Sequence, residues 1–126
     1  MEMTLLDTNI LIEFLKGNPQ TIQQLETIDD PLAISVITQM ELFYGALNKR
    51  ELKQLDMFTN SFEIIHITPS ISRHATALIK EYAKSHNLDI PDSLIAATAI
   101  VNSLPLFTYN TKDSHFIEGL RFYHAS

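Results

Sequence analysis

The sequence contains no cysteine, which excludes a disulfide framework, a thiolate metal site and a cysteine nucleophile. It also lacks any apolar run near the roughly 20 residues that a helix needs to cross a bilayer. Asp7 and Asn9 interrupt the apolar start of the chain before a signal-peptide core can form. These absences favour a cytoplasmic protein with no membrane association.

Basic residues are scarce, because 9 Lys and Arg stand against 15 Asp and Glu, for a formal net charge of −6. A protein that coats nucleic acid nonspecifically usually shows a basic surface. If four of the acids form a metal site, 9 basic residues face 11 acidic ones and the rest of the chain is nearly neutral. The charge therefore argues against tight nonspecific RNA binding. It is compatible with a phosphodiester substrate that is held by a metal ion and by the shape of the site.

The chain does contain an alternation of short apolar segments with helical ones. Its 126 residues, 45% of them hydrophobic, are enough for a single domain over residues 1–126 with its own core. Strands alternating with helices predict a three-layer α/β/α protein, with a mainly parallel central sheet covered on both faces. The predicted strands are 3–6, 32–37, 62–67, 104–108 and 120–123, and the predicted helices are 10–15, 21–28, 38–47, 51–60, 71–85 and 93–102, with a turn and short helix over 110–116.

Four acidic residues stand where predicted strands end or predicted helices begin: Asp7, Glu41, Asp92 and Asp113. Ligands of parallel sheets bind beyond the carboxyl ends of the strands, so we expect these acids at one edge of the sheet. Carboxylates crowded together repel one another and raise one another's pKa unless a counter-ion is present. A hard divalent cation such as Mg²⁺ or Mn²⁺ takes oxygen ligands and would relieve that repulsion.

Helix capping is an alternative role for the same residues. Thr38 and Glu41 have the spacing of a capping box, in which a Thr side chain and a Glu three residues later satisfy the first backbone N–H groups of a helix. Asp7, Asp92 and Asn110 are also of the residue types that favour helix N-caps. Spacing does not choose between capping and metal ligation, and one residue can do both.

Four motifs, taken in order along the chain, match segments of one known family. Leu5–Ile12 (LLDTNILI) is similar to the opening strand and acid of that family, and Ile34–Gly45 (ISVITQMELFYG) to its strand–Thr-x-x-Glu-Leu–x-x-Gly segment. Asp92–Ala99 (DSLIAATA) resembles the Asp-x-Leu-Ile-Ala-Ala-x-Ala helix, and Phe107–Asp113 (FTYNTKD) the Thr-x-Asn-x-x-Asp ending. Together these motifs resemble the PIN-domain family, and in particular VapC-like toxins of type II toxin–antitoxin pairs. They span nearly the whole chain, so residues 1–126 are expected to be a single PIN-like domain.

The resemblance implies a metal site formed by Asp7, Glu41, Asp92 and Asp113. The family commonly has Phe directly after its last acid, whereas two residues separate Asp113 from Phe116 here, so direct and water-mediated ligation by Asp113 both stay open. Asp89 is interpreted as a solvated loop acid outside the site. The residues implied to orient ligands or water are Thr8, Asn9, Thr38 and Asn110.

The function implied is that of a Mg²⁺-dependent or Mn²⁺-dependent endoribonuclease toxin that hydrolyses an RNA phosphodiester with a metal-activated water. Resemblance also implies a homodimer and inhibition by a VapB-like antitoxin, whose basic tail could lay an Arg among the carboxylates. Lys49, Arg50 and Lys53 could grip RNA phosphates, or simply form a solvated helix face.

The apolar residues Leu42, Phe43 and Leu47 beside Tyr44 are open to two interpretations, namely core packing and a groove for the antitoxin.

Two rival functions follow from the same residues. A haloacid-dehalogenase-like phosphatase also places an aspartate after its first strand, but that class needs Asp-x-Asp, and Asn9 cannot act as the general acid. A catalytically silent PIN-like binding module is the other alternative. A zinc enzyme is disfavoured, because the five histidines lie in different predicted elements without ligand spacing.

Overall fold

The computed structural model describes residues 2–125 and is built around a four-stranded sheet whose neighbouring strands all run parallel. The strands are β1 (Thr4–Leu6), β2 (Leu32–Ser35), β3 (Glu63–Ile65) and β4 (Leu106–Phe107). Their spatial order is β3-β2-β1-β4. The chain therefore moves outward from β1 to β3 and then returns to the other side of β1 to form β4, which makes the β1–β4 edge the switch point where parallel sheets bind ligands.

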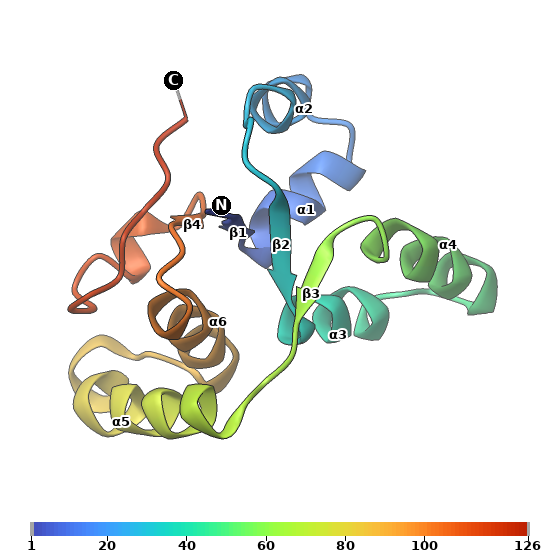
Figure 1. Ribbon diagram of the computed structural model, residues 1–126. Coiled ribbons are helices and arrows are strands. Elements are labelled where there is room, and N and C mark those ends of the chain that lie inside the picture. The colour runs from blue at the N-terminus through green and yellow to red at the C-terminus, as the bar shows by residue number, and fades with distance from the viewer. Residues whose placement is uncertain (1, 126) are drawn as a thin grey trace.

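Helices cover both faces of this sheet (Figure 1). The helices are α1 (Thr8–Leu15), α2 (Pro19–Glu26), α3 (Val36–Tyr44), α4 (Lys49–Thr59), α5 (Pro69–His86) and α6 (Ile90–Val101), followed by a short 3-10 helix, η1 (Thr111–Asp113).

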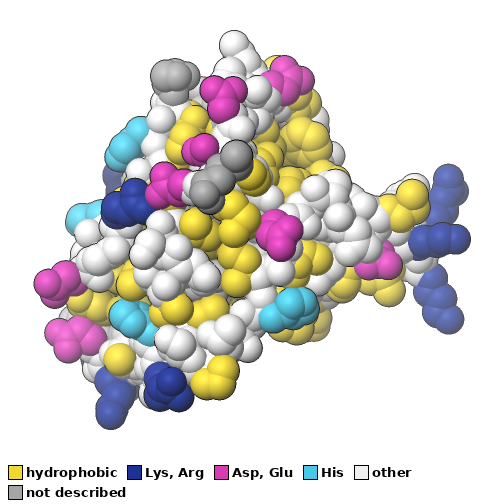
Figure 2. Space-filling model, viewed as in Figure 1, with side chains coloured by type: hydrophobic (Ala, Val, Ile, Leu, Met, Phe, Trp, Pro, Cys, Tyr) yellow, Lys and Arg dark blue, Asp and Glu magenta, His cyan; other side chains and the backbone are white. Residues whose placement is uncertain are grey.

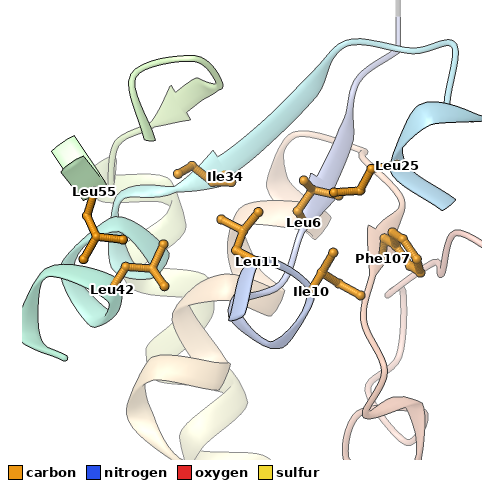
Figure 3. Packing of buried hydrophobic residues seen from close by; sticks show 8 residues of the cluster. All are labelled: Leu6, Ile10, Leu11, Leu25, Ile34, Leu42, Leu55 and Phe107. Carbon is orange, nitrogen blue, oxygen red and sulfur yellow. The ribbon is translucent and has the colours of Figure 1, made fainter. Parts of the chain in front are cut away.

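The core divides at the sheet because side chains of a strand alternate between its two faces. Leu6, Ile34 and Phe107 point to one face, where the cluster in Figure 3 joins them to buried residues of α1, α2, α3 and α4. Leu5, Ala33 and Leu106, one residue earlier in each strand, point to the opposite face and pack against α6. The three-layer α/β/α prediction with a parallel sheet is confirmed.

Helix α6 is apolar on nearly all sides because it lies between the sheet and α5. Ile95 and Ala99 pack towards the sheet, whereas Ala96 and Ala97 pack with the α5 side of the core. The small alanine side chains allow these layers to approach closely, and all four residues are at most 2% exposed. The helix that carries Asp92 is thus fixed in position by packing along its length.

The second strand is shorter than predicted, and the capping-box hypothesis is wrong. Ser35 ends the strand because its side chain accepts a hydrogen bond from the Ile37 N–H at 3.0 Å, so Val36 and Ile37 belong to α3 instead of the strand. Thr38 consequently lies inside the helix and caps nothing.

Several helix boundaries also differ from prediction. Helix α3 ends at Tyr44, and Asn48 starts α4 as a separate helix by accepting the Glu51 N–H at 2.8 Å. The N-cap of α6 is Asp89, not Asp92, so this helix begins at Ile90.

The predicted final strand over 120–123 contributes only one bridge, between Phe122 and Leu106. Leu106 donates its N–H to the Arg121 carbonyl, and Tyr123 donates to the Leu106 carbonyl, both at 2.9 Å. Within residues 2–125, none of the helices is both long and apolar enough to cross a membrane.

Replacing Ser35 by Ala tests the start of α3. The variant loses a buried N-cap, and we expect its free energy of unfolding to fall by about 1 kcal/mol in urea titrations. Ser72→Ala, at an exposed position of α5, is the control and is expected to change stability by less than about 0.5 kcal/mol. Equal stabilities of the Ser35→Ala and Ser72→Ala variants would contradict the assignment of Ser35 as the cap.

Candidate active site

A cavity of about 230 Å³ lies at the carboxyl ends of the strands, and the four predicted acids line it together. Asp7 follows β1, Glu41 lies on α3, Asp92 lies in the first turn of α6, and Asp113 ends η1. Parts of the chain that are far apart in sequence thus meet at the edge where the sheet topology predicts a ligand. The apolar part of the lining comes from Ile12, Ile95, Ala96 and Leu106.

Asp7 is the most constrained of the acids. It is the N-cap of α1, and its carboxylate accepts the Thr8 N–H at 2.8 Å and the Thr108 hydroxyl at 2.9 Å. Asn9 points its amide at the same carboxylate from 3.4 Å and donates to the Thr108 hydroxyl at 3.0 Å. Burial raises the pKa of Asp7, and the hydrogen bonds from Thr108 and Thr8 partly oppose that shift. Asp7 therefore both caps the helix and faces the cavity.

Glu41 is oriented by two threonines. The Thr8 hydroxyl donates to the Glu41 carboxylate at 2.7 Å, and the Thr8 and Thr38 hydroxyls lie 2.9 Å apart. Since Thr8 has one hydroxyl proton and gives it to Glu41, Thr38 must donate to Thr8. Thr38 is fully buried, so this chain of hydrogen bonds ties an exposed carboxylate to a fixed point in the core.

Asp92 carries the largest electrostatic strain in the site. Its pKa is raised to about 7, first by desolvation and then by repulsion from Asp89, Asp7, Glu41 and Asp113. The upward shift expected for crowded carboxylates is thus present at Asp92 and, by burial, at Asp7.

Asp113 and Asn110 are exposed and line the cavity on the side of η1. Asn110 precedes η1, and its backbone N–H donates to the Thr108 hydroxyl at 3.0 Å. Its side chain forms no capping hydrogen bond and lines the cavity instead. Asn110 therefore does not act as a side-chain N-cap.

Sequence reasoning missed two residues that shape the site. Thr108 directly follows β4, is 5% exposed and links Asp7, Asn9 and the Asn110 backbone. It is the last residue of the predicted strand 104–108, and its contacts with Asn9 and Asp7, about a hundred residues away, leave no signal in the local pattern. Asp89 is exposed, as expected, but it caps α6 by accepting the Asp92 N–H at 2.9 Å, and its charge acts on both Asp92 and Asp7.

The predicted basic cluster lies outside the cavity lining. Lys49, Arg50 and Lys53 are exposed in the first turns of α4. Figure 2 shows Lys and Arg side chains gathered at the tip of the molecule where Figure 1 places α4. Lys49 and Lys53 instead flank a groove of about 490 Å³ whose apolar walls are Phe43 and Leu52.

The apolar residues at the end of α3 divide between core and surface. Leu42 is 7% exposed and belongs to the core, whereas Tyr44 is 94% and Leu47 86% exposed. Core packing therefore explains Leu42 but not Tyr44 or Leu47.

The donor chemistry of the cavity fits a hard divalent cation. The acids supply carboxylate oxygens, and their repulsion adds to desolvation in raising the pKa of Asp92, so a cation among them would oppose that shift. Among residues 2–125, however, no three acidic or histidine side chains stand close enough to hold one ion jointly. Mg²⁺ commonly uses one or two carboxylates and keeps several waters, so the cavity fits a hydrated ion better than a fully dehydrated one.

A family model described as PIN domain matches residues 4–117 of the chain. The chain belongs to the PIN-domain family. Among PIN-domain relatives, it is 35% identical to Ribonuclease VapC10 of Mycobacterium tuberculosis, over 94% of this chain and 91% of that protein.

Solved structures of this PIN-domain type agree with the fold. A toxin–antitoxin complex from Klebsiella pneumoniae matches with a TM-score of 0.79 and 38% identity, over 93% of this chain and 94% of that one. DNA-bound VapBC from Salmonella typhimurium matches with a TM-score of 0.83 and 28% identity, over 98% of both chains. The likeness extends over nearly the whole PIN domain, including the segments that carry the acids.

The stability of the Asp92→Asn variant at different pH values tests the electrostatic strain at Asp92. Because folding raises the pKa of Asp92 from 3.8 to about 7, the folded state binds its proton more tightly, and the stability due to this group falls as the pH rises through that window. In metal-free buffer we expect Asp92→Asn to melt above the wild type near pH 8. The difference in melting temperature between Asp92→Asn and the wild type should shrink near pH 5, where folded Asp92 is mostly protonated.

Asp29→Asn, an exposed position after α2, is the control and should show no such pH-dependent gain. A wild type that is as stable as Asp92→Asn at both pH values would contradict the strain at Asp92.

Proposed function

We propose that this PIN domain is a Mg²⁺-dependent or Mn²⁺-dependent endoribonuclease, acting as the toxin of a type II toxin–antitoxin pair. The observation that carries the proposal is the convergence of Asp7, Glu41, Asp92 and Asp113 on one cavity at the switch point of the sheet. The name of the relative Ribonuclease VapC10 supports RNA as the substrate class.

Asp7 and Asp92 are the proposed principal ligands of the cation, with Glu41 and Asp113 assisting through direct contact or through water. When bound, the cation would lower the pKa of a water molecule and neutralise charge on the phosphodiester. Asp7 suits this role because Thr8 and Thr108 fix its carboxylate. Ligand orientation by such partners commonly affects metal affinity or activity about 10–100-fold.

Glu41 is the proposed acceptor for the proton of the attacking water. Its carboxylate is exposed to the cavity, and the hydrogen bond from Thr8 limits its rotation. A general base must be held within reach of the proton it removes. The Thr38–Thr8–Glu41 chain supplies that constraint without adding a charge.

The proposed partners are an RNA substrate, a VapB-like antitoxin and a second copy of this chain. The Klebsiella pneumoniae toxin–antitoxin complex supports the antitoxin. The acidic cavity attracts a basic segment, and a guanidinium could pair with its carboxylates. The exposed Tyr44 and Leu47, near the groove walled by Phe43 and Leu52, supply an apolar surface for the same partner.

The basic residues Lys49, Arg50 and Lys53 have a separate proposed role in contacting RNA phosphates beyond the cavity. Their exposure on α4 leaves the ammonium and guanidinium groups free to face a long substrate.

The geometry disfavours the two rival functions. A phosphatase of the haloacid-dehalogenase type needs a general acid at position 9, and Asn9 instead uses its side chain to bridge Tyr109, Thr108 and Asp7. A silent binding module has no need for four carboxylates in one cavity, where they raise the pKa of Asp92 to about 7.

Purified protein should cleave single-stranded RNA in the presence of Mg²⁺ or Mn²⁺, and EDTA should stop the reaction. Asp7→Asn and Asp92→Asn should each reduce the cleavage rate by more than about a hundredfold, because ligands matter at least as much as the partners that orient them. The measurement is initial rate on a labelled oligonucleotide.

Asp29→Asn is the matched control, since it removes one exposed carboxylate away from the cavity. Undiminished cleavage by Asp7→Asn or Asp92→Asn would remove this mechanism. Absence of any RNA cleavage by the wild type would favour the silent binding module.

A further inference from the structure

A second cleft, of about 400 Å³, adjoins the acidic cavity. Asn9 and Asn110 line both hollows, so the two are neighbours at the carboxyl end of β4. The remaining walls come from the end of α1, the start of α2 and the loop after β4, and they are Glu13, Asn18, Gln20 and Tyr109. A substrate whose phosphodiester reaches the acids would extend its neighbouring nucleotide into this cleft.

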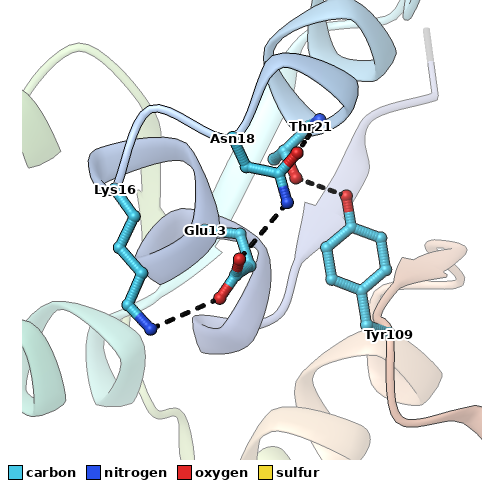
Figure 4. Close-up of polar contacts among 5 residues, drawn as sticks. All are labelled: Glu13, Lys16, Asn18, Thr21 and Tyr109. Carbon is cyan, nitrogen blue, oxygen red and sulfur yellow. Dashed lines mark hydrogen bonds and ion pairs between the residues drawn. The ribbon is translucent and has the colours of Figure 1, made fainter.

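Tyr109 gives the cleft a rigid aromatic surface. Its hydroxyl lies 2.7 Å from the hydroxyl of Thr21, which is fully buried (Figure 4). The same hydroxyl donates to the Gln24 side chain. The ring also contacts Phe107 edge to face, with centroids 5.6 Å apart. Both ends of the side chain are therefore held, yet 41% of the residue remains exposed. A fixed aromatic ring loses little conformational entropy when another ring stacks on it.

Two amide side chains beside this ring are available for hydrogen bonding. Across the described residues, the side chains of Gln20 and Asn110 form no hydrogen bond to another protein group. Asn18, by contrast, is occupied, because it caps α2 and donates to Glu13 at 3.3 Å. The cleft therefore presents one ring and two uncommitted amides, each able to donate and accept.

The charge of the cleft disfavours a phosphate as its occupant. Glu13 places a carboxylate there, and Lys16 lies 3.6 Å from it on the outer side (Figure 4). The neighbouring acids of the cavity add further negative potential. A neutral planar group with hydrogen-bonding edges suits this setting, and N–H donors on that group would pair with Glu13.

We propose that the cleft between Tyr109 and the start of α2 binds the nucleobase next to the cleaved phosphodiester and sets the sequence preference of the enzyme. Proteins recognise single-stranded RNA by stacking bases on aromatic side chains and reading their edges with polar groups. Tyr109 supplies the stacking surface, while Gln20 and Asn110 read the edge. Glu13 favours adenine, cytosine or guanine, which carry amino donors, over uracil, whose one N–H on that edge lies between two carbonyl oxygens that a carboxylate repels. This inference rests on the proposed ribonuclease function.

The test compares oligonucleotides that carry each of the four bases, or an abasic nucleotide, on either side of the cleaved bond. The wild type should lose about tenfold or more in kcat/KM when the base in the cleft is removed, from the usual strength of base–aromatic stacking. Tyr109→Leu should cleave the abasic and intact substrates at the same rate. Tyr109→Phe, which keeps the ring, should retain most of the difference in rate between the intact and abasic substrates.

Gln20→Ala provides a second variant at an exposed position that carries little risk to folding. It should alter the order of preference among the four bases, whereas Gln23→Ala, exposed on the same helix but outside the cleft, should not. Side-chain changes at Tyr109 leave the Asn9 contact in place, because Asn9 accepts from the Tyr109 backbone N–H. The base subsite would be overturned if Tyr109→Leu still cleaved the intact substrate faster than the abasic one and Gln20→Ala kept the wild-type order of preference among the bases. The ribonuclease function would stand in that case.

A wild type that cleaves no RNA would refute the proposed function. RNA binding, measured without cleavage, would then test the base subsite independently. RNA labelled with the fluorescent base 2-aminopurine should be quenched on binding to the wild type. Loss of quenching in Tyr109→Leu supports the subsite, and equal quenching in both proteins overturns it.

Discussion

The pairing of β1 with β4 determines the position of the site. Leu5 and Leu6 lie in parallel register with Leu106 and Phe107, so the next residue of each strand, Asp7 and Thr108, emerges at the same edge. The Thr108 hydroxyl then meets the Asp7 carboxylate at 2.9 Å. Because side chains alternate between the two faces of a strand, a one-residue slip in this register would separate Asp7 from Thr108. It would also exchange the faces to which Leu5 and Leu6 point, and so disrupt both halves of the core.

The acidic cavity works against the stability of the rest of the fold. Desolvation and four neighbouring carboxylates hold the pKa of Asp92 at about 7. The packing of α6 between the sheet and α5 fixes this residue in that unfavourable position. Binding that favours the folded state stabilises it by mass action, so a cation in the cavity would relieve the strain and support the fold as well as the chemistry. A basic segment of a partner protein would relieve the same charge.

The polar neighbours of the acids divide the site into a fixed part and an adaptable part. Thr8, Thr38 and Thr108 orient Asp7 and Glu41 through hydrogen bonds, and Thr38 and Thr108 are themselves buried. Asp113 is exposed at the end of a three-residue 3-10 helix. This contrast agrees with the proposal that Asp7 is a principal ligand and that Asp113 only assists.

Much of this architecture could be predicted from the order of apolar segments and acids. The alternation of strands and helices indicated the three-layer fold, and the position of each acid after a strand or at a helix start indicated convergence. The boundaries at Ser35 and Asp89 could not be predicted, because several neighbouring Ser, Thr and Asp residues are equally good caps and tertiary packing decides among them. The role of Thr108 and the anchoring of Tyr109 depend on contacts between segments about a hundred residues apart, for which local pattern carries no signal.

The most direct test of the central claim is the location of a bound cation. Crystals soaked in Mn²⁺ should show an anomalous difference peak in the cavity, within reach of Asp7 and Asp92, and crystals of the Asp92→Asn protein should show a weaker peak or none. A strong peak elsewhere on the molecule with none in the cavity, at a Mn²⁺ concentration that supports RNA cleavage, would contradict the account.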